Sequence, residues 1–424
     1  MKFLTILSIA LRCLFPKSHQ KRTEAEKSLL GALFAVGISI VPLVVVMNVS
    51  EGMISGISQR LIELSGLHMQ VMPYFEGNID AAIRDFEILK EGLEKIPGVT
   101  GAYSEVNCIA LAAGKKARNG ISLRGLDEAL LQRENFRSLL KITEGELAFP
   151  EKNSVILAHS LAEKIGASVN DKIRVITLSA KDGKVLPKIS LFKVSGIITC
   201  GYNELDSLWA LVSLENALSL ARSGGFSPYL TIACENAFSR DFPEIRKLAE
   251  GILPVGYHLA TWDEVHSTEF ENFRSTKILL LLITVLIILV ASINISSALI
   301  MLITERQKEI GILKSCGTSS KDILLIFLFV GLLTGFFGLA VGIPLGIIIA
   351  KNANFLITFT ERIINVFGDV HLLDPTYYLR DFSVEVSPVL IIQVIAGVIV
   401  LVTIVSLFPA LRAAKKKPVK MLRG

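Results

Sequence analysis

Charged side chains are absent from four long stretches of this 424-residue chain. The stretches cover residues 28–50, 278–303, 323–350 and 386–411, and none contains Asp, Glu, Lys, Arg or His. A helix of about 20 apolar residues crosses the roughly 30 Å hydrocarbon layer of a membrane. We therefore predict four transmembrane helices. The same absence excludes the proton relays and ion sites that secondary transporters build from ionisable groups within the membrane.

Motifs for catalysis are absent as well. The sequence has no G-x-x-x-x-G-K-[ST] loop for nucleotide phosphates, no G-x-S-x-G elbow and no H-E-x-x-H pair. Its five cysteines and six histidines show no C-x-x-C or H-x-x-x-H spacing. We predict no catalytic residue, no cofactor and no metal, so the energy for any transport comes from a partner.

Cysteine is scarce outside the membrane. Cys108, Cys200 and Cys234 fall in short apolar runs typical of strands. One disulfide among them and three buried free thiols are both open from the sequence.

The basic residues predict the orientation. Lys and Arg gather in 1–27, 304–322 and 412–424, whereas 351–385 holds more acidic than basic residues. Short segments rich in Lys and Arg stay on the cytoplasmic side. Both termini are therefore expected in the cytoplasm, with 51–277 and 351–385 outside. Because the basic residues are divided among three segments, the net charge of +5 does not indicate a nucleic-acid partner.

Periodicity divides the external region 51–277. A strand, a helix with apolar residues at helical spacing and a second strand are predicted over 68–112, and the same order returns over 227–260. Between them, about 121–223 contains short β-rich runs separated by turn residues. The predicted fold class is an α-helical membrane protein with four transmembrane helices (1+3) and a large mixed α/β domain, a split α/β unit with an inserted β-rich unit. Residues 1–27 are expected to hold a helix in the cytoplasmic interface.

Two features leave alternatives open. Residues 179–187 join two strands, and Asp182-Gly183 favours a hairpin tip whose exposed Val185-Leu186 either binds a partner or is only a connection. The third hydrophobic stretch carries a stripe of small residues, which indicates close helix packing within the subunit, or at a dimer interface or a moving interface. The stripe consists of Gly331, Gly335, Gly338, Gly342 and Gly346.

Two cytoplasmic stretches carry a family resemblance. Residues 305–317 read E-R-Q-K-E-I-G-I-L-K-S-C-G, and residues 409–422 read P-A-L-R-A-A-K-K-K-P-V-K-M-L. They resemble the motifs E-[KR]-x-x-E-I-x-I-L-[KR]-x-x-G and P-x-x-R-A-[AS]-x-x-x-P-[AV]-x-x-L of the FtsX-like (MacB-type) ABC permeases. The runs I-A-L-R-C-L at 9–14 and L-F-K-V-S-G at 191–196 are similar to those of the lipoprotein-releasing (Lol-type) members.

This resemblance implies a function and partners. It implies a permease subunit in the inner membrane of a diderm bacterium that releases lipoproteins to a periplasmic carrier. A second permease, identical or different, and a separate ATP-binding subunit complete the transporter. A MacB-like exporter of peptides or drugs and an FtsX-like regulator of a cell-wall hydrolase are the alternatives.

The resemblance and the residue pattern together suggest three groups of functional residues. ATPase coupling is expected at 304–322, through Glu305, Arg306, Glu309, Ile310, Gly311, Lys314 and Gly317. Carrier binding is expected at Asp182, Gly183, Lys184, Val185, Leu186 and Pro187. Spans without charge favour an apolar cavity for lipid, lined by Val41, Val44, Val45, Met47, Asn48, Ile287, Val290 and Asn294.

Overall fold

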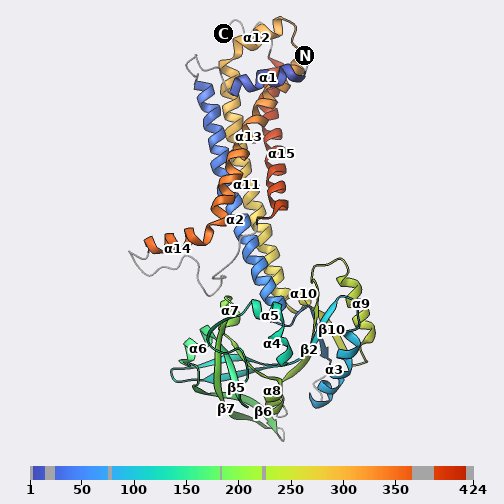
Figure 1. Ribbon diagram of the computed structural model, residues 1–424. Coiled ribbons are helices and arrows are strands. Elements are labelled where there is room, and N and C mark those ends of the chain that lie inside the picture. The colour runs from blue at the N-terminus through green and yellow to red at the C-terminus, as the bar shows by residue number, and fades with distance from the viewer. Residues whose placement is uncertain are drawn as a thin grey trace. The chain divides into compact units, whose positions relative to one another are not determined.

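The computed structural model describes residues 3–14, 24–74, 79–181, 184–221, 226–364 and 386–416 (Figure 1). The chain divides into two compact units. The membrane unit comprises Met1–Met53, Phe273–Gly368 and Ser383–Gly424, and the soluble unit comprises chiefly Ile54–Asn272.

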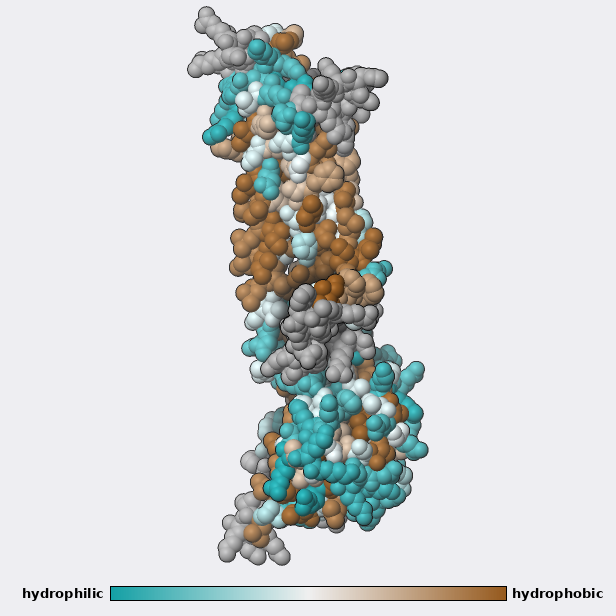
Figure 2. Space-filling view, turned by 90° about the vertical axis from the view of Figure 1, so that its left-hand side faces the viewer, coloured by the Kyte–Doolittle hydropathy of each residue, from teal (hydrophilic) through white to brown (hydrophobic). Residues whose placement is uncertain are grey.

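Four helices are long and apolar enough to cross a membrane, as predicted. They are α2 (Glu24–Leu64), α11 (Ser267–Glu305), α13 (Ser320–Lys351) and α15 (Pro388–Lys415). Their apolar side chains form a broad hydrophobic band on the face of the membrane unit that Figure 2 shows. At 41 and 39 residues, α2 and α11 are longer than the uncharged stretches 28–50 and 278–303. Charge limits what lies in lipid but does not end a helix, and residues 51–64 and 267–277 contain no proline.

Glycines on α13 bring the membrane helices together. A Cβ on Gly342 would lie 2.7 Å from the carbonyl oxygen of Gly37 on α2, and one on Gly331 would lie 2.3 Å from Ser406 Oγ on α15. Such distances are possible only without a side chain. The stripe therefore packs within the subunit. Short helices complete the unit, namely α1 (Phe3–Leu14), which packs against α13, α12 (Gln307–Ser315) and α14 (Ala353–Ile364).

The soluble unit is built on one ten-stranded sheet of order β10-β1-β9-β2-β3-β8-β5-β7-β4, with β6 paired to β2 and β7. The strands are β1 (Met69–Pro73), β2 (Val99–Ala113), β3 (Arg118–Leu126), β4 (Lys141–Gly145), β5 (Ser154–Ala158), β6 (Lys172–Lys181), β7 (Lys184–Thr199), β8 (Trp209–Ser213), β9 (Ser227–Cys234) and β10 (Tyr257–Thr261). The helices are α3 (Ile79–Leu93), α4 (Glu128–Gln132), α5 (Glu134–Ser138), α6 (His159–Ile165), α7 (Asn203–Asp206), α8 (Leu214–Ala221), α9 (Phe242–Ile252) and α10 (Trp262–Val265).

Two hydrophobic cores share this sheet. The first contains residues from the predicted apolar stripes of α3 and α9, including Phe86 and Ala249, whereas Leu248 and Ile252 of the α9 stripe are exposed. The second contains the β-rich stretch, with Phe192 and Leu157 among its buried side chains. β2 contributes to both, through Ala102 to the first core and Val106 to the second. The predicted insert is therefore continuous with the flanking sheet, because a strand of 15 residues is long enough to pair in both halves.

Replacing Gly342 tests the glycine packing. We expect Gly342→Ala to lower the free energy of unfolding by about 1–3 kcal/mol, because the new methyl group overlaps α2. Gly397→Ala on α15 is the matched control, since its Cβ would meet only Ile288 Cδ1 at 3.7 Å. The measurement is the fraction of monodisperse protein left after heating in detergent. Equal midpoints for the two variants would contradict the packing.

Candidate functional site

The helix between the second and third spans has two different faces. Ile310 and Gly311 on α12 are buried in the membrane unit. Lys308, Glu309 and Ile312 are exposed, and their spacing places them on one side of the helix. Ile312 is 55% exposed, so this face presents an apolar side chain among charges. A face of this composition suits docking to another protein.

Lys314 joins α12 to the end of α15. Its Nζ donates hydrogen bonds of 2.7 Å to the carbonyl oxygens of Ala414 and Lys416. The last carbonyls of a helix have no partner within the helix, and the negative end of the helix dipole favours a cation there. The side chain therefore fixes α12 to α15 of its own subunit.

The predicted coupling residues are divided by the structure. Glu305 and Glu309 are exposed, and Arg306 donates to Glu309 at 2.6 Å. Ile310, Gly311 and Lys314 point into the subunit. Gly317 has a φ of +91° in the turn after α12, a conformation that glycine adopts most easily. Lys308 and Ile312, which lie on the same exposed side, were not among the predicted coupling residues, although their spacing of four was a signal for a shared helix face.

The β6–β7 hairpin carries an exposed apolar surface. Ile176 on β6 lies directly opposite Leu111 on β2 and Ile189 on β7, so the three side chains form one row across the sheet. In the same registers, Leu178 is opposite Pro187 and Leu191 is opposite Arg174. Ile109, Leu178, Ile189 and Leu191 are 58–86% exposed. We name this surface the apolar sheet face, and it consists of Ile109, Leu111, Ile176, Leu178, Pro187, Ile189 and Leu191.

The opposite side of the same strands is buried. Val175 and Phe192 lie in the second hydrophobic core, so the alternation of the strands does not require apolar residues on the outer side. Lys172 and Arg174 are exposed at one end of the apolar sheet face. Soluble proteins rarely expose a contiguous apolar patch without a binding role. The structure therefore offers a docking surface with an apolar centre and a basic edge.

The predicted carrier-binding residues reach this surface only in part. Asp182 and Gly183 lie outside the described residues. The pairing of β6 with β7 includes residues 184–187. Its last pair is Lys181 with Lys184. Leu186 is 54% exposed, and Pro187 belongs to the apolar sheet face. Ile189 and Leu191 of the apolar sheet face were not predicted. Their alternation with Pro187, at every second residue of a strand, was the signal in the sequence.

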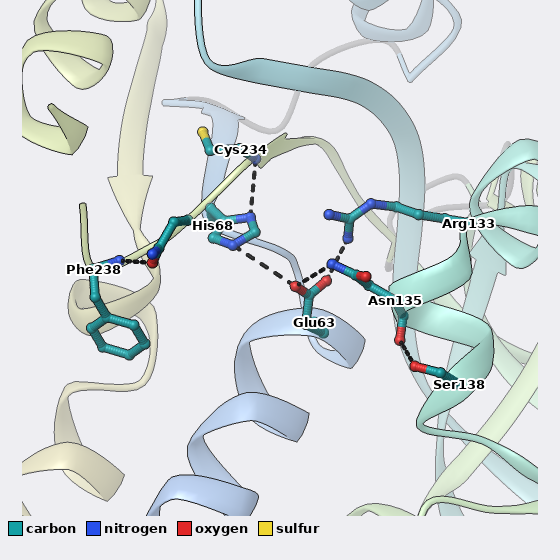
Figure 3. Close-up of polar contacts among 8 residues, drawn as sticks. Glu63, His68, Arg133, Asn135, Ser138, Cys234 and Phe238 are labelled. Carbon is teal, nitrogen blue, oxygen red and sulfur yellow. Dashed lines mark hydrogen bonds and ion pairs between the residues drawn. The ribbon is translucent and has the colours of Figure 1, made fainter.

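The last turn of α2 ends in a polar cluster of the soluble unit (Figure 3). The Glu63 carboxylate accepts hydrogen bonds from Arg133 and from Asn135 Nδ2, the latter at 3.2 Å. The neighbouring carbonyl of Leu64 accepts from Arg124, which is itself paired with buried Glu105. A charged network thus anchors the end of α2. Breaking a buried pair of this kind is expected to cost roughly 3–5 kcal/mol, because one charge is left uncompensated.

His68 extends the cluster to β9. Its Nδ1 accepts the backbone N–H of Cys234 at 3.1 Å, so Nε2, 3.9 Å from Glu63, carries the proton of the neutral ring. Burial lowers the pKa of His68 from 6.5 to about 4, against the opposing effect of Glu63 and with a further lowering by Arg133. A neutral His68 therefore connects α2 with β9.

The three cysteines of the soluble unit, Cys108, Cys200 and Cys234, are free and buried. Burial raises the pKa of the Cys108 and Cys234 thiols to about 11. The pKa of Cys200 is also raised, by burial and by nearby Asp206. Of the two readings left open by the sequence, the structure has the free thiols, and they are unreactive at neutral pH.

The predicted lipid-cavity residues do not share one surface of the subunit. Val44 packs at Gly346, and Asn48 is buried, where its Oδ1 accepts the backbone N–H of Ser387 at 3.3 Å. Val41, Val45, Met47 and Ile287 are partly buried. Val290 and Asn294 are exposed on α11. In the described membrane unit, α11 and α15 both leave most of their apolar residues uncovered, and the two predicted cavity residues Val290 and Asn294 lie on the open side of α11.

Two protein families match successive parts of the chain. The MacB-like periplasmic core domain matches residues 29–236, and the FtsX-like permease C-terminal domain matches residues 281–418. The lipoprotein-releasing system transmembrane protein LolC of Neisseria meningitidis is 28% identical, over 92% of this chain and 93% of that protein. LolE of Haemophilus influenzae is 24% identical over 95% and 96%. The periplasmic region of MacB from Actinobacillus actinomycetemcomitans shows 15% identity, covers 49% of this chain and 94% of that chain, and has a TM-score of 0.32.

These features define a multi-pass membrane protein with a large α/β domain between its first and second spans. The chain belongs to the FtsX-like ABC transporter permeases that carry a MacB-like periplasmic core domain.

The contacts of Lys314 generate one prediction. We expect Lys314→Met to raise hydrogen exchange of the α12 amides roughly tenfold, because two carbonyls at the end of α15 lose a charged donor worth about 1.5 kcal/mol. Lys308→Met on the exposed face is the control and should leave exchange unchanged. Similar exchange in both variants would show that Lys314 does not hold the helix.

The environment of His68 generates a second prediction. Its folded-state pKa lies below its unfolded value, so the stability it contributes is complete above pH 6.5 and falls as the pH approaches 4. The loss is at most about 1.4 kcal/mol per pH unit. Unfolding is followed by tryptophan fluorescence of the full chain in detergent, since Trp209 and Trp262 both lie in the soluble unit. His266, whose pKa burial also lowers, contributes in the same direction.

The variant His68→Gln isolates this contribution. It should reduce the dependence of the unfolding free energy on pH between 6.5 and 4, whereas His159→Gln on α6 should not. An unchanged pH dependence in His68→Gln would contradict the assignment.

Proposed function

We propose that this chain is the permease subunit of an ABC transporter that releases lipoproteins from the inner membrane and transfers them to a periplasmic carrier. The observation that carries the proposal is similarity along nearly the full chain to proteins named as lipoprotein-releasing permeases, with 92% coverage for the Neisseria protein. A separate ATP-binding subunit supplies the energy, as the absence of a phosphate-binding loop requires.

The ATPase subunit docks on the exposed face of α12. The positive-inside rule favours a cytoplasmic position for the termini and α12. Glu305, Lys308, Glu309 and Ile312 form the contact, with Ile312 as the apolar anchor. Lys314 passes the movement of α12 to α15 through its bonds to the end of that helix. Docking and transmission are thus divided between the two sides of one short helix.

The second permease and the lipid path lie along α11. Its exposed side chains include Val290 and the amide of Asn294, a polar group that is costly to leave facing hydrocarbon. A partner permease, identical or different, covers part of this face. Acyl chains pass along the remainder, with Val41, Val45 and Met47 of the first span as the neighbouring wall.

The carrier docks on the apolar sheet face. Its apolar centre suits a protein that receives acyl chains, and Lys172 and Arg174 favour an acidic rim on that protein. Residues 184–186, which continue the strand pairing next to Pro187, extend the contact. Paired strands keep the ribbon ordered before binding, which lowers the entropy lost on association.

A release assay tests the proposal. The permease, its ATPase subunit and a radiolabelled lipoprotein are reconstituted in proteoliposomes, and transfer to the soluble carrier is measured. We expect transfer that requires both ATP and carrier. Transfer of no lipoprotein, with ATPase activity intact, would contradict the function.

Variants of the apolar sheet face test the docking site separately. We expect Ile189→Glu to weaken carrier binding at least tenfold, or about 1.4 kcal/mol, while ATPase activity persists. The side chain is 61% exposed, so the charge does not enter the core. The control is Ile88→Glu on α3, which is 74% exposed in the other half of the domain. Deletion of 182–186 should give the same loss. Equal carrier affinity for Ile189→Glu and Ile88→Glu would reject the site.

A further inference from the structure

The helix α14 follows the third span directly and exposes an apolar side. Phe355, Leu356, Phe359 and Ile363 are 39–69% exposed, although each is a large apolar side chain. At 3.6 residues per turn, these four positions fall within an arc of about 100°. The Phe355 and Phe359 rings are stacked with their centroids 6.2 Å apart, which makes the surface continuous. Nothing in the described part of the membrane unit covers it.

The start of α14 coincides with the end of the apolar band. Gly346 of α13 lies at Val44 of α2, so Lys351 and Glu51 are five and seven residues beyond the same contact. Glu51 pairs with Lys277 of α11 at 2.9 Å. These two charged residues directly border the uncharged stretches 28–50 and 278–303 at the same end of the membrane unit. α14 begins two residues after Lys351, at Ala353. The helix therefore starts at the membrane boundary, on the face opposite the two termini.

The direction of α14 differs from that of the spans. Figure 1 shows α14 running sideways from the end of α13, away from the long helices. Ala353 is buried, and the backbone N–H of Leu356 donates to the carbonyl of Asn352, so the turn from α13 is hydrogen-bonded. A helix at this level and in this direction runs along the surface of the bilayer.

The amino-acid composition of α14 indicates that its exposed apolar side faces lipid and not water. Residues 352–360 include no charged side chain, whereas the water-exposed helix α3 has six in its 15 residues. An amphipathic helix in the interface buries its apolar side among the lipid headgroups and upper acyl chains. Continuity with the apolar band of the spans favours lipid as the occupant over a second copy of the chain.

We propose that α14 is an interfacial helix whose Phe355, Leu356, Phe359 and Ile363 insert into the leaflet opposite the termini. It anchors the outer end of α13 in that leaflet. The inference rests on the membrane unit alone and does not depend on lipoprotein release.

Site-directed spin labelling tests this placement in the full chain. Single cysteines replace Phe355, Phe359, Ile363 or Thr358 in a Cys13→Ser, Cys316→Ser background, because the other three thiols are buried. The protein is reconstituted in vesicles of phosphatidylethanolamine and phosphatidylglycerol. Power saturation then compares collisions with oxygen, which concentrates in lipid, and with a water-soluble nickel chelate.

We expect labels at 355, 359 and 363 to show an oxygen-to-nickel ratio several-fold higher than the label at Thr358, which lies outside the apolar arc. Ile392 of α15 is the lipid control, and Ile88 of α3 is the water control, since both are well exposed. A double change, Phe355→Ser with Phe359→Ser, should lower the ratio at 363 because the helix loses its anchors.

Two results would overturn the proposal. Ratios at 355, 359 and 363 equal to that at Ile88 would place the helix in water. Exclusion of both reagents would show that protein covers the surface, either a second copy or another part of the transporter.

Discussion

The polar network that binds the last turn of α2 is the interaction on which the rest of the structure depends. A single helix of 41 residues carries glycine-packed membrane contacts near one end and the Glu63 cluster at the other. Arg124, Arg133 and Asn135 bind its last turn, and His68 connects that turn to β9. Because these groups are largely buried, a movement of the helix end without the surrounding strands would leave charges unpaired. The helix and the domain core near its end are therefore expected to move together.

Three surfaces with exposed apolar side chains differ in their surroundings. On α12, Ile312 stands alone among charges, as expected for an anchor in a small protein contact. On β2, β6 and β7, seven residues form the apolar sheet face, whose reverse side packs in the second hydrophobic core. On α14, the apolar residues follow a span and carry no charge among them until after residue 360. The size of each surface and its distance along the chain from the spans distinguish a protein partner from lipid.

Lys314 shows where pattern and structure differ. Its position in a charged, motif-bearing helix predicted a role at the surface, together with Glu305 and Glu309. The structure directs it to the carbonyls of Ala414 and Lys416, about 100 residues away in the chain. Val44 and Asn48 were predicted to line a lipid cavity, but both are buried within the subunit. Their burial depends on which face of α2 meets α13 and on where Ser387 lies. No local periodicity contains that information.

The sequence by itself determined the four spans, the strand and helix stripes and the β6–β7 ribbon. Lipid excludes charge, and a half-buried helix or strand must alternate at its own period, so these features are written locally. Tertiary structure alone decided that β2 serves two cores, that the glycine stripe packs within the subunit and that the outer side of the hairpin is apolar across three strands. Each of these depends on contacts between segments far apart in the chain. Several pairings of such segments fit the local sequence pattern equally well, and strand register and the distance of closest approach decide which of them forms.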